Sequence, residues 1–317
     1  MSHTPDKIAI VGAGSVGAAI AYACLIRGVA RHVALYDTNK AKVSAEALDL
    51  NHGLQFVPPA TLEGSDDLAV CAGASVVVVT AGAKQHSGQS RMDLAAANTA
   101  ICKDLIPKLQ GVCPDANFLL VTNPVDVITY VTLKVSGLPP ARVIGSGTVL
   151  DSSRFRFLIA QRLRVAVQNV HAYIAGEHGD SEIPLWSSAS AGNVPLHAWA
   201  VPGHGKMTVR DRVEIFENVK TAAQQIIAGK GATNYAIGLS TAQILEALLN
   251  DENRVLPVSA LTAGQTDDGA EVCMSLPRIV SRAGTGPALP VPLNENERLG
   301  LRESAKTILA AVRGVGF

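Results

Sequence analysis

Short apolar runs and stretches of helical periodicity alternate along the first half of the chain. The apolar runs are rich in β-branched residues, and they fall at residues 7–12, 32–37, 75–82, 117–123 and 142–145. Unbroken apolar strands that alternate with helices are typical of a parallel sheet covered by helices on both faces. We therefore predict a doubly wound α/β domain of the Rossmann type over residues 1–145.

The pattern changes after residue 145. Strands and helices no longer alternate strictly, which favours an α+β second domain over residues 146–317. Asn294 and Glu297 form a candidate capping pair before the last helix. The expected helices cover residues 151–164, 207–227, 233–249 and 295–312, and the expected strands cover 167–175, 254–261 and 271–279.

Charge and cysteine content narrow the class of protein. Lys plus Arg equals Asp plus Glu at 27 each, so no global field attracts nucleic acid or an acidic membrane. The five cysteines are odd in number and contain no Cys-x-x-Cys pair, so neither a disulfide framework nor a zinc site is indicated, and no metal is expected. They are expected to be buried, reduced thiols.

The chain shows no targeting or membrane-spanning pattern. Its first residues, MSHTPDK, are polar where a signal peptide needs an apolar core. Gly, Arg and Asp interrupt every apolar run before the roughly 18 residues of a membrane span. We expect a soluble, cytoplasmic protein with no membrane partner.

A glycine-rich turn follows the first strand. Gly12, Gly14 and Gly17 form Gly-x-Gly-x-x-Gly at the start of a predicted helix that runs from 15 to 27 and stops at Gly28. The first glycine allows a tight turn, the second a close approach of a pyrophosphate, and the third close packing of helix on strand. Free N–H groups at the start of the helix, from Ser15 and Val16 onward, then face the phosphates.

An acidic residue ends the next strand. Asp37 lies 20 residues beyond Gly17, near the spacing at which a carboxylate accepts hydrogen bonds from the adenosine ribose. Because a carboxylate there repels a 2′-phosphate, NAD is favoured over NADP as the cofactor.

Three further segments carry side chains that can exchange a proton or bind an anion. His178 follows a strand in a Gly-flanked turn and can exchange a proton near neutral pH. Asp151 and Arg154 are three residues apart on a predicted helix, so one face can orient His178 and grip a carboxylate. Arg91 stands where a Gly-punctuated loop becomes a helix, from which it can reach a carbonyl.

These segments, in this order, resemble the L-lactate/L-malate dehydrogenase family over essentially the whole chain. The resemblance implies NAD-dependent hydride transfer between the cofactor and a small 2-hydroxy or 2-keto acid. It implies that His178 is the proton donor and acceptor, Asp151 its orienting partner, Arg154 the carboxylate anchor and Arg91 the arginine that polarises the carbonyl.

Two more motifs match the family. The stretch Val121-Thr-Asn-Pro resembles a segment whose asparagine, here Asn123, contacts cofactor or substrate, and Gly231-Ala-Thr233 resembles the stretch that closes the substrate pocket. The expected cofactor-binding set is therefore Gly12, Gly14, Ser15, Val16, Gly17, Asp37, Gly82, Ala83, Val121 and Asn123.

Gln85 bears on the choice of substrate. In the family this position is arginine in enzymes that use oxaloacetate and glutamine in those that use pyruvate. A neutral amide leaves a second carboxylate without a charge partner, which is costly in a closed site. The resemblance thus implies pyruvate and L-lactate, with malate or another 2-hydroxy acid as the alternative.

Arg156 and His171 match a pair that binds fructose 1,6-bisphosphate between subunits in bacterial members of the family. The resemblance implies activation of a homotetramer by that sugar bisphosphate. The alternative is a solvent-facing basic residue and an interface histidine. Small and apolar residues at helical spacing in 41–52 also favour a homo-oligomer.

A protein of another class would fit the glycine turn alone. A non-catalytic NAD-binding regulator would keep this turn and lose at least one of His178, Asp151 and Arg154. All three are present, which favours the enzyme.

Overall fold

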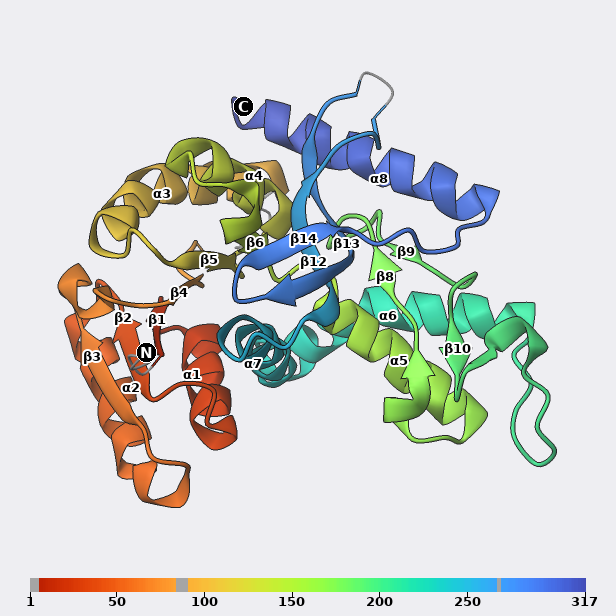
Figure 1. Cartoon of the computed structure of the whole chain (residues 1–317), viewed down its shortest axis with the longest axis horizontal. Coiled ribbons are helices and arrows are strands. Elements are labelled where there is room, and N and C mark those ends of the chain that lie inside the picture. The colour runs from red at the N-terminus through yellow and green to blue at the C-terminus, as the bar shows by residue number, and fades with distance from the viewer. Residues whose placement is uncertain (1–5, 84–90, 267–268) are drawn as a thin grey trace.

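The computed structural model describes residues 6–83, 91–266 and 269–317. Six parallel strands form the N-terminal half of its main sheet, which is drawn at the left of Figure 1. Their order, from the outer edge inward, is β3 (Thr61–Ser65), β2 (His32–Tyr36), β1 (Lys7–Val11), β4 (Val76–Val79), β5 (Asn117–Leu120) and β6 (Val143–Gly145).

Five of these strands confirm the predictions made from the apolar runs, whereas β3 was not predicted. In β3 only Leu62 is buried, and the sequence of this strand, TLEGS, therefore has no apolar run like those of the other strands. It pairs with β2 in parallel at the sheet edge.

Helices cover both faces of the sheet, as a doubly wound fold requires. Alternate side chains of β1, β4 and β5 face two separate clusters, because side chains of a strand point alternately to its two faces. One face packs against α3 (Arg91–Val112), α4 (Val125–Ser136) and α8 (Glu295–Gly314). The other packs against α1 (Ser15–Arg27), α2 (Lys40–His52) and α7 (Tyr235–Leu249), and α7 lies beside α1 in Figure 1.

Three antiparallel strands extend the same sheet beyond residue 145. They are β12 (Arg254–Thr262), β13 (Val272–Ser281) and β14 (Gly284–Ala288). The sequence predicted the first two as part of a separate α+β unit, but β12 joins β6 through Ser259 opposite Gly145. A Cβ on Gly145 would lie 2.9 Å from the Cβ of Ser259, so glycine permits this close pairing. The nine-stranded sheet therefore continues from one half of the chain into the other.

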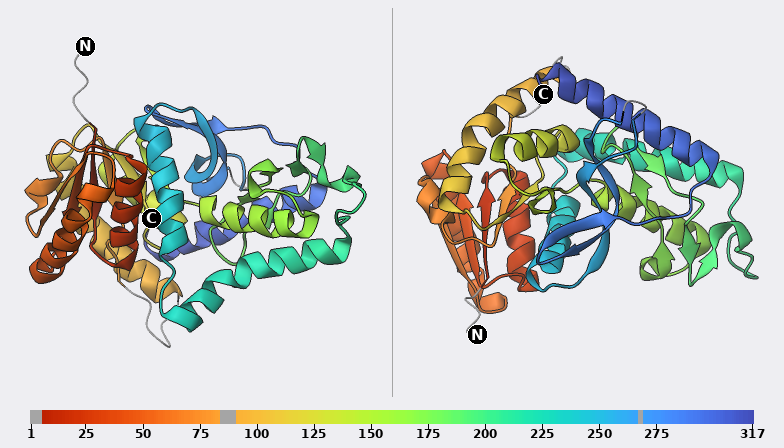
Figure 2. Two further views of the ribbon diagram at one scale, coloured as in Figure 1. Left: turned by 90° about the horizontal axis from the view of Figure 1, so that it is seen from below. Right: turned by 45° about the horizontal axis from the view of Figure 1, so that its top comes forward.

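The remaining elements form a smaller layer beside this sheet, drawn in green and teal in Figure 2. Phe155 packs edge-on against Trp186 in its core, with ring centroids 4.6 Å apart. Its helices are α5 (Val149–Leu163) and α6 (Val209–Lys230), and its strands are β7 (Val170–His171), β8 (Ile174–Ala175), β9 (Ile183–Pro184), β10 (Ser190–Ala191) and β11 (Val194–Pro195). The 3-10 helices of the described chain are Leu54–Phe56, Leu68–Cys71, Pro140–Arg142, Val167–Asn169 and Leu196–Ala198.

The last helix, the strand before His178 and the cysteines agree with the sequence predictions to different degrees. The Asn294 and Glu297 capping box is confirmed, since each side chain accepts from the other residue's backbone N–H. The single strand expected before His178 is wrong in detail, because it divides into β7 and β8. All five cysteines are free and buried, as expected. Within the described residues, no helix combines the length and apolarity that a membrane span needs.

Candidate active site

The glycine turn between β1 and α1 is crowded where the chain folds back and open where a ligand would approach. Gly12 has a φ of +109°, and a Cβ there would lie 2.7 Å from Thr80 Oγ1. A Cβ on Gly17 would overlap the carbonyl oxygen of Gly12, whereas one on Gly14 would meet only Lys42 Nζ, at 4.0 Å. Gly12 and Gly17 thus shape the turn, and Gly14 leaves space beside it.

The N-terminus of α1 provides hydrogen-bond donors at this space. Gly14 is the N-cap, with no capping hydrogen bond from a side chain and no acidic residue in the first turn. The N–H groups around Ser15 and Val16 and the positive end of the helix dipole therefore suit a phosphate. Lys42 adds a positive charge beside Gly14 that no sequence motif indicated. These features fit the pyrophosphate of NAD.

Asp37 lies at the carboxyl end of β2, beside the glycine turn. Its Oδ2 accepts a hydrogen bond from the Ala13 N–H at 2.7 Å, and its Oδ1 accepts one from the Asn39 N–H at 2.9 Å. These bonds fix the carboxylate at the turn, and each oxygen keeps a further lone pair for a ribose hydroxyl. Its position fits the expected role.

The expected residues after β4 and β5 lie at the same edge of the sheet. Val121 extends β5, with its N–H donating to the Val79 carbonyl at 2.9 Å. Gly82 and Ala83 follow β4, and Asn123 precedes Pro124 across a cis peptide bond. Because parallel strands end together, these residues line the end of the sheet at which the glycine turn also lies.

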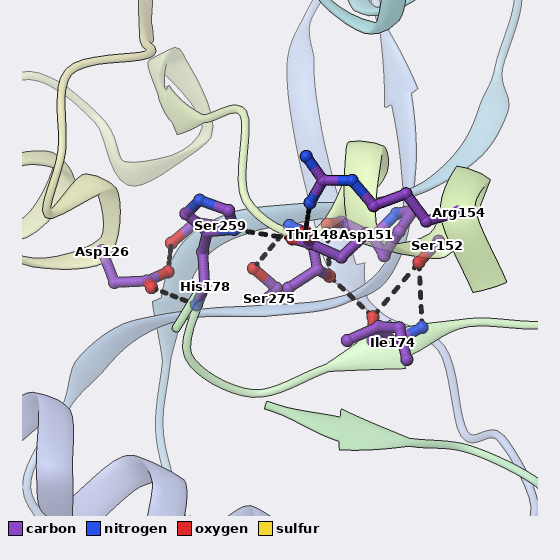
Figure 3. A network of polar contacts seen from close by, with 10 residues as sticks. Asp126, Thr148, Asp151, Ser152, Arg154, Ile174, His178, Ser259 and Ser275 are labelled. Carbon is purple, nitrogen blue, oxygen red and sulfur yellow. Dashed lines mark hydrogen bonds and ion pairs between the residues drawn. The ribbon is translucent and has the colours of Figure 1, made fainter. Parts of the chain in front are cut away.

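His178, Asp151 and Arg154 form one connected group, as the sequence predicted (Figure 3). His178 Nδ1 lies 2.6 Å from Asp151 Oδ2, and Arg154 Nη1 donates to Asp151 Oδ1, also at 2.6 Å. Asp151 is almost fully buried. Since its carboxylate only accepts, Nδ1 of the imidazole carries the proton of the first bond, and Nε2 is directed away from Asp151.

Hydrogen bonds join the start of α5 to the strand that leads to His178. Thr148 Oγ1 donates to the Ile174 carbonyl at 2.6 Å, and Ser152 Oγ accepts from the Ile174 N–H at 2.9 Å. Asp151 lies in the first helical turn between these two contacts. The local fold thus sets the distance between the carboxylate and the imidazole before any ligand binds.

The charges of this group shift its titration. The negative charge of Asp151 is the largest cause that raises the pKa of His178, to about 9, and it outweighs burial, which favours the neutral ring. For Asp151, burial alone would raise the pKa, but His178 and Arg154 together lower it. At neutral pH the pair is therefore an imidazolium and a carboxylate, with a proton available to a substrate.

Asp126 is a second carboxylate at His178, and the sequence motifs indicated no role for it. Its Oδ2 accepts from the backbone N–H of His178 at 2.7 Å, and its Oδ1 accepts from Ser259 Oγ at 2.6 Å. Burial raises its pKa to about 6, against the opposing effect of these bonds. A polar residue inside the apolar run of α4 was the sequence signal. Figure 3 shows His178 between Asp126 and Asp151.

Glu182 is a third buried carboxyl group near this cluster, and no sequence motif indicated it. It is 6% exposed, and Oε1 has no hydrogen-bond partner in the described structure. Burial, followed by the charge of Asp151, raises its pKa to about 8. Glu182 is therefore neutral at pH 7, which avoids an unpaired buried charge.

The expected substrate residues are only partly described. Gln85 lies outside the described residues, and of Arg91 only the backbone is described, at the first position of α3. Thr233 lies in the turn between α6 and α7, two residues after Gly231, which has a φ of +82°. No hydrogen bond described in the structure joins Thr233 to His178.

Arg156 and His171 lie on α5 and β7. Arg156 Nε donates to the Ala172 carbonyl at 2.8 Å, and its guanidinium lies 4.9 Å from the ring centroid of Tyr173. Arg156 is thus partly buried rather than freely solvated, while His171 is exposed. No cluster of three or more His, Cys, Asp or Glu side chains that could hold a metal occurs in the described chain.

Comparisons with known families match both halves of the chain. The family model described as lactate/malate dehydrogenase, NAD binding domain, matches residues 6–145. The model for the lactate/malate dehydrogenase alpha/beta C-terminal domain matches residues 148–315. With the fold above, these matches define an NAD-dependent oxidoreductase with the nucleotide site in its N-terminal half.

Individual relatives agree with this class. An L-lactate dehydrogenase of Bifidobacterium animalis subsp. lactis is 51% identical over 99% of this chain and 98% of its own. One of Thermus aquaticus is 46% identical over 98% and 100%. A crystal structure of the minor L-lactate dehydrogenase from Enterococcus mundtii superposes with a TM-score of 0.92 at 38% identity, over 98% of each chain. The chain belongs to the lactate/malate dehydrogenase family.

Proposed function

We propose that the protein is an L-lactate dehydrogenase that interconverts pyruvate and L-lactate with NADH and NAD. The observation that supports this most is the bonded group of His178, Asp151 and Arg154 at the start of α5. An acid beside an arginine suits a substrate with a carbonyl next to a carboxylate. The relatives named above as L-lactate dehydrogenases support the same activity.

The residues around the glycine turn would hold NADH, which would supply the hydride for C2 of pyruvate. His178 Nε2 donates its proton to the carbonyl oxygen, which becomes the hydroxyl of lactate. Asp151 holds the ring through Nδ1 and stabilises the imidazolium before the transfer. In the opposite direction neutral His178 accepts the hydroxyl proton.

The substrate carboxylate is assigned to Arg154. One guanidinium nitrogen, Nη1, is bonded to Asp151, so the carboxylate must use the remaining N–H groups. Arg91 is assigned to the carbonyl, Asn123 to cofactor and substrate, and Thr233 to the pocket wall. We assign the NAD-binding domain to residues 1–145 and the substrate domain to residues 146–317. We also propose that the protein is cytoplasmic.

The substrate choice rests on Gln85, a neutral side chain where a dicarboxylate needs a cation. Steady-state kinetics with NADH and either pyruvate or oxaloacetate test it. We expect a higher kcat/KM for pyruvate, and Gln85→Arg should shift the preference toward oxaloacetate. A wild-type preference for oxaloacetate would instead identify a malate dehydrogenase.

We also propose a homotetramer that responds to fructose 1,6-bisphosphate through Arg156 and His171. The exposed His171 supports a contact outside this chain, and so does α2, of which only Val43 and Ala47 are buried while Leu48 is 59% exposed. Mass photometry and pyruvate kinetics with and without the sugar bisphosphate test this. If the sugar bisphosphate changes neither the mass nor the KM for pyruvate, the proposed activation is wrong.

A further inference from the structure

A buried asparagine on α3 connects two of the segments that we assign to the ligands. Asn98 is 2% exposed. Its Oδ1 accepts a hydrogen bond from the Ala83 N–H, and its Nδ2 donates one to the Asn123 carbonyl, both at 2.7 Å. Ala83 follows β4 and Asn123 follows β5. The Asn98 side chain therefore links the two segments that follow these neighbouring strands.

Both partners are exposed, whereas the side chain that joins them is not. Ala83 and Asn123 are exposed at the carboxyl edge of the sheet, and Asn98 lies beneath them. Their backbone groups could otherwise bond to water, and the bonds to Asn98 fix them relative to each other instead. The contact thus orders a surface rather than filling the core.

The packing around this contact leaves little freedom. A Cβ on Gly82 would lie 3.0 Å from Asn98 Oδ1 and 2.5 Å from Thr122 Cγ2. Thr122 Oγ1 in turn donates to the Ala81 carbonyl at 2.8 Å. The two segments therefore contact each other directly and through Asn98.

The chemistry of the contact requires a neutral amide. One partner is a donor and the other an acceptor, so the side chain must accept and donate at the same time. A carboxylate could accept from Ala83 but would place a lone pair against the Asn123 carbonyl. A serine hydroxyl is too short to replace both ends of the amide.

We propose that Asn98 is a positioning residue for the active site, which holds Ala83 and Asn123 at the separation that cofactor and substrate need. This role rests on the function proposed above, in which these two residues contact the ligands. The helix that carries Asn98 also begins with Arg91, so the same contact fixes the start of α3 relative to both segments.

Asn98→Ala removes both bonds. We expect about a tenfold weaker affinity for NADH, measured by fluorescence without substrate, and a loss of at least similar size in kcat/KM for pyruvate. Thr99→Val is the matched control, because Thr99 is the next residue of α3, is buried, and has a hydroxyl without a partner in the described structure. It should leave both quantities unchanged.

Asn98→Asp separates positioning from a general loss of stability. A protonated carboxyl both accepts and donates, as the amide does, whereas the carboxylate only accepts. The activity of N98D relative to wild type should therefore be low at about pH 8 and recover as the pH falls through the pKa of the buried carboxyl. A constant ratio at all pH values, in a folded variant, would contradict the proposal.

Hydrogen–deuterium exchange of the wild-type protein needs no variant. The exposed Ala83 amide should exchange slowly without NADH, because Asn98 holds it; fast exchange would overturn the proposal, as would N98A with wild-type affinity and kcat/KM. If wild type fails to reduce pyruvate, the proposed function is wrong. The amide exchange and the NADH affinities still test Asn98 in that case.

Discussion

The turn after β1 and the turn after β8 both follow a short strand, yet they hold their chemistry in different ways. The glycine turn uses backbone groups, and it requires the absence of a side chain at Gly12 and Gly17, where a Cβ would collide with neighbouring atoms. The His178 turn uses side chains from distant parts of the sequence, including Asp126 and Asp151. Binding of the cofactor should thus depend on local shape, and catalysis on a network of buried charges.

The largest expected effect is confined to the His178 turn. His178→Asn removes the acid, and kcat for pyruvate should fall about 10²–10⁴-fold, the usual contribution of acid–base catalysis. The NADH affinity should stay close to that of wild type, because the glycine turn is unchanged. Stopped-flow turnover and fluorescence titration measure the two quantities.

His197→Asn is the control for this substitution, since His197 is exposed on a 3-10 helix away from the network. It should retain wild-type kinetics. Near-normal turnover of the His178 variant would remove this residue from the mechanism.

A smaller effect should mark the glycine turn. Gly14→Ala adds a methyl group that meets no atom of the described protein closer than Lys42 Nζ at 4.0 Å, so the fold should be unaffected. The methyl group should still obstruct the pyrophosphate and raise the Kd for NADH about tenfold to hundredfold.

Calorimetric titration with NADH and a thermal melt without it test both parts of this prediction. Gly17→Ala makes the contrast, because its Cβ would overlap the Gly12 carbonyl and lower the melting temperature as well. An unchanged Kd in Gly14→Ala would place the pyrophosphate elsewhere.

The smallest effect should come from Glu182, which is neutral at pH 7 and ionises near pH 8. Its ionised form helps to raise the pKa of His178. Glu182→Gln should therefore leave kcat/KM for pyruvate at pH 7 nearly unchanged and move the alkaline decline of that parameter to lower pH. Glu217→Gln, on the exposed side of α6, should move nothing.

Protein stability gives a second measure of Glu182. Its folded pKa lies above its ordinary value of 4.5, so the folded state keeps the proton while the unfolded state loses it. Its contribution to stability is therefore lost as pH rises from about 4.5 to 8. The free energy of unfolding of Glu182→Gln, minus that of wild type, should therefore be larger at pH 8 than at pH 5. An equal difference at both pH values would contradict the burial argument.

The difference between the two turns also explains what the sequence could predict. Gly12, Gly14 and Gly17 lie within six residues, so a local motif identified them, and apolar runs identified five of the six parallel strands. The strand β3 was not predicted, because an edge strand with one buried residue has no apolar run. The extension of the sheet by β12 depends on pairing between residues 145 and 259, which no local pattern records.

The network around His178 was predictable only in part. Asp151 and Arg154 were found because they share a helix face and because the family resemblance gave them roles. Glu182 and Asn98 were missed, since their importance comes from burial and from partners brought close by folding. Glu182 stands in a polar turn and Asn98 among small residues of a helix, so neither position differs in sequence from a solvent-exposed one.

The pH dependence of kcat/KM for pyruvate tests the central claim most directly, because His178 must be protonated for reduction. In wild type, kcat/KM should decline with an apparent pKa of about 9, since Asp151 stabilises the imidazolium. In Asp151→Asn, the decline should move closer to the ordinary value of 6.5. An alkaline limb that stays in place when Asp151 is neutralised would contradict the account.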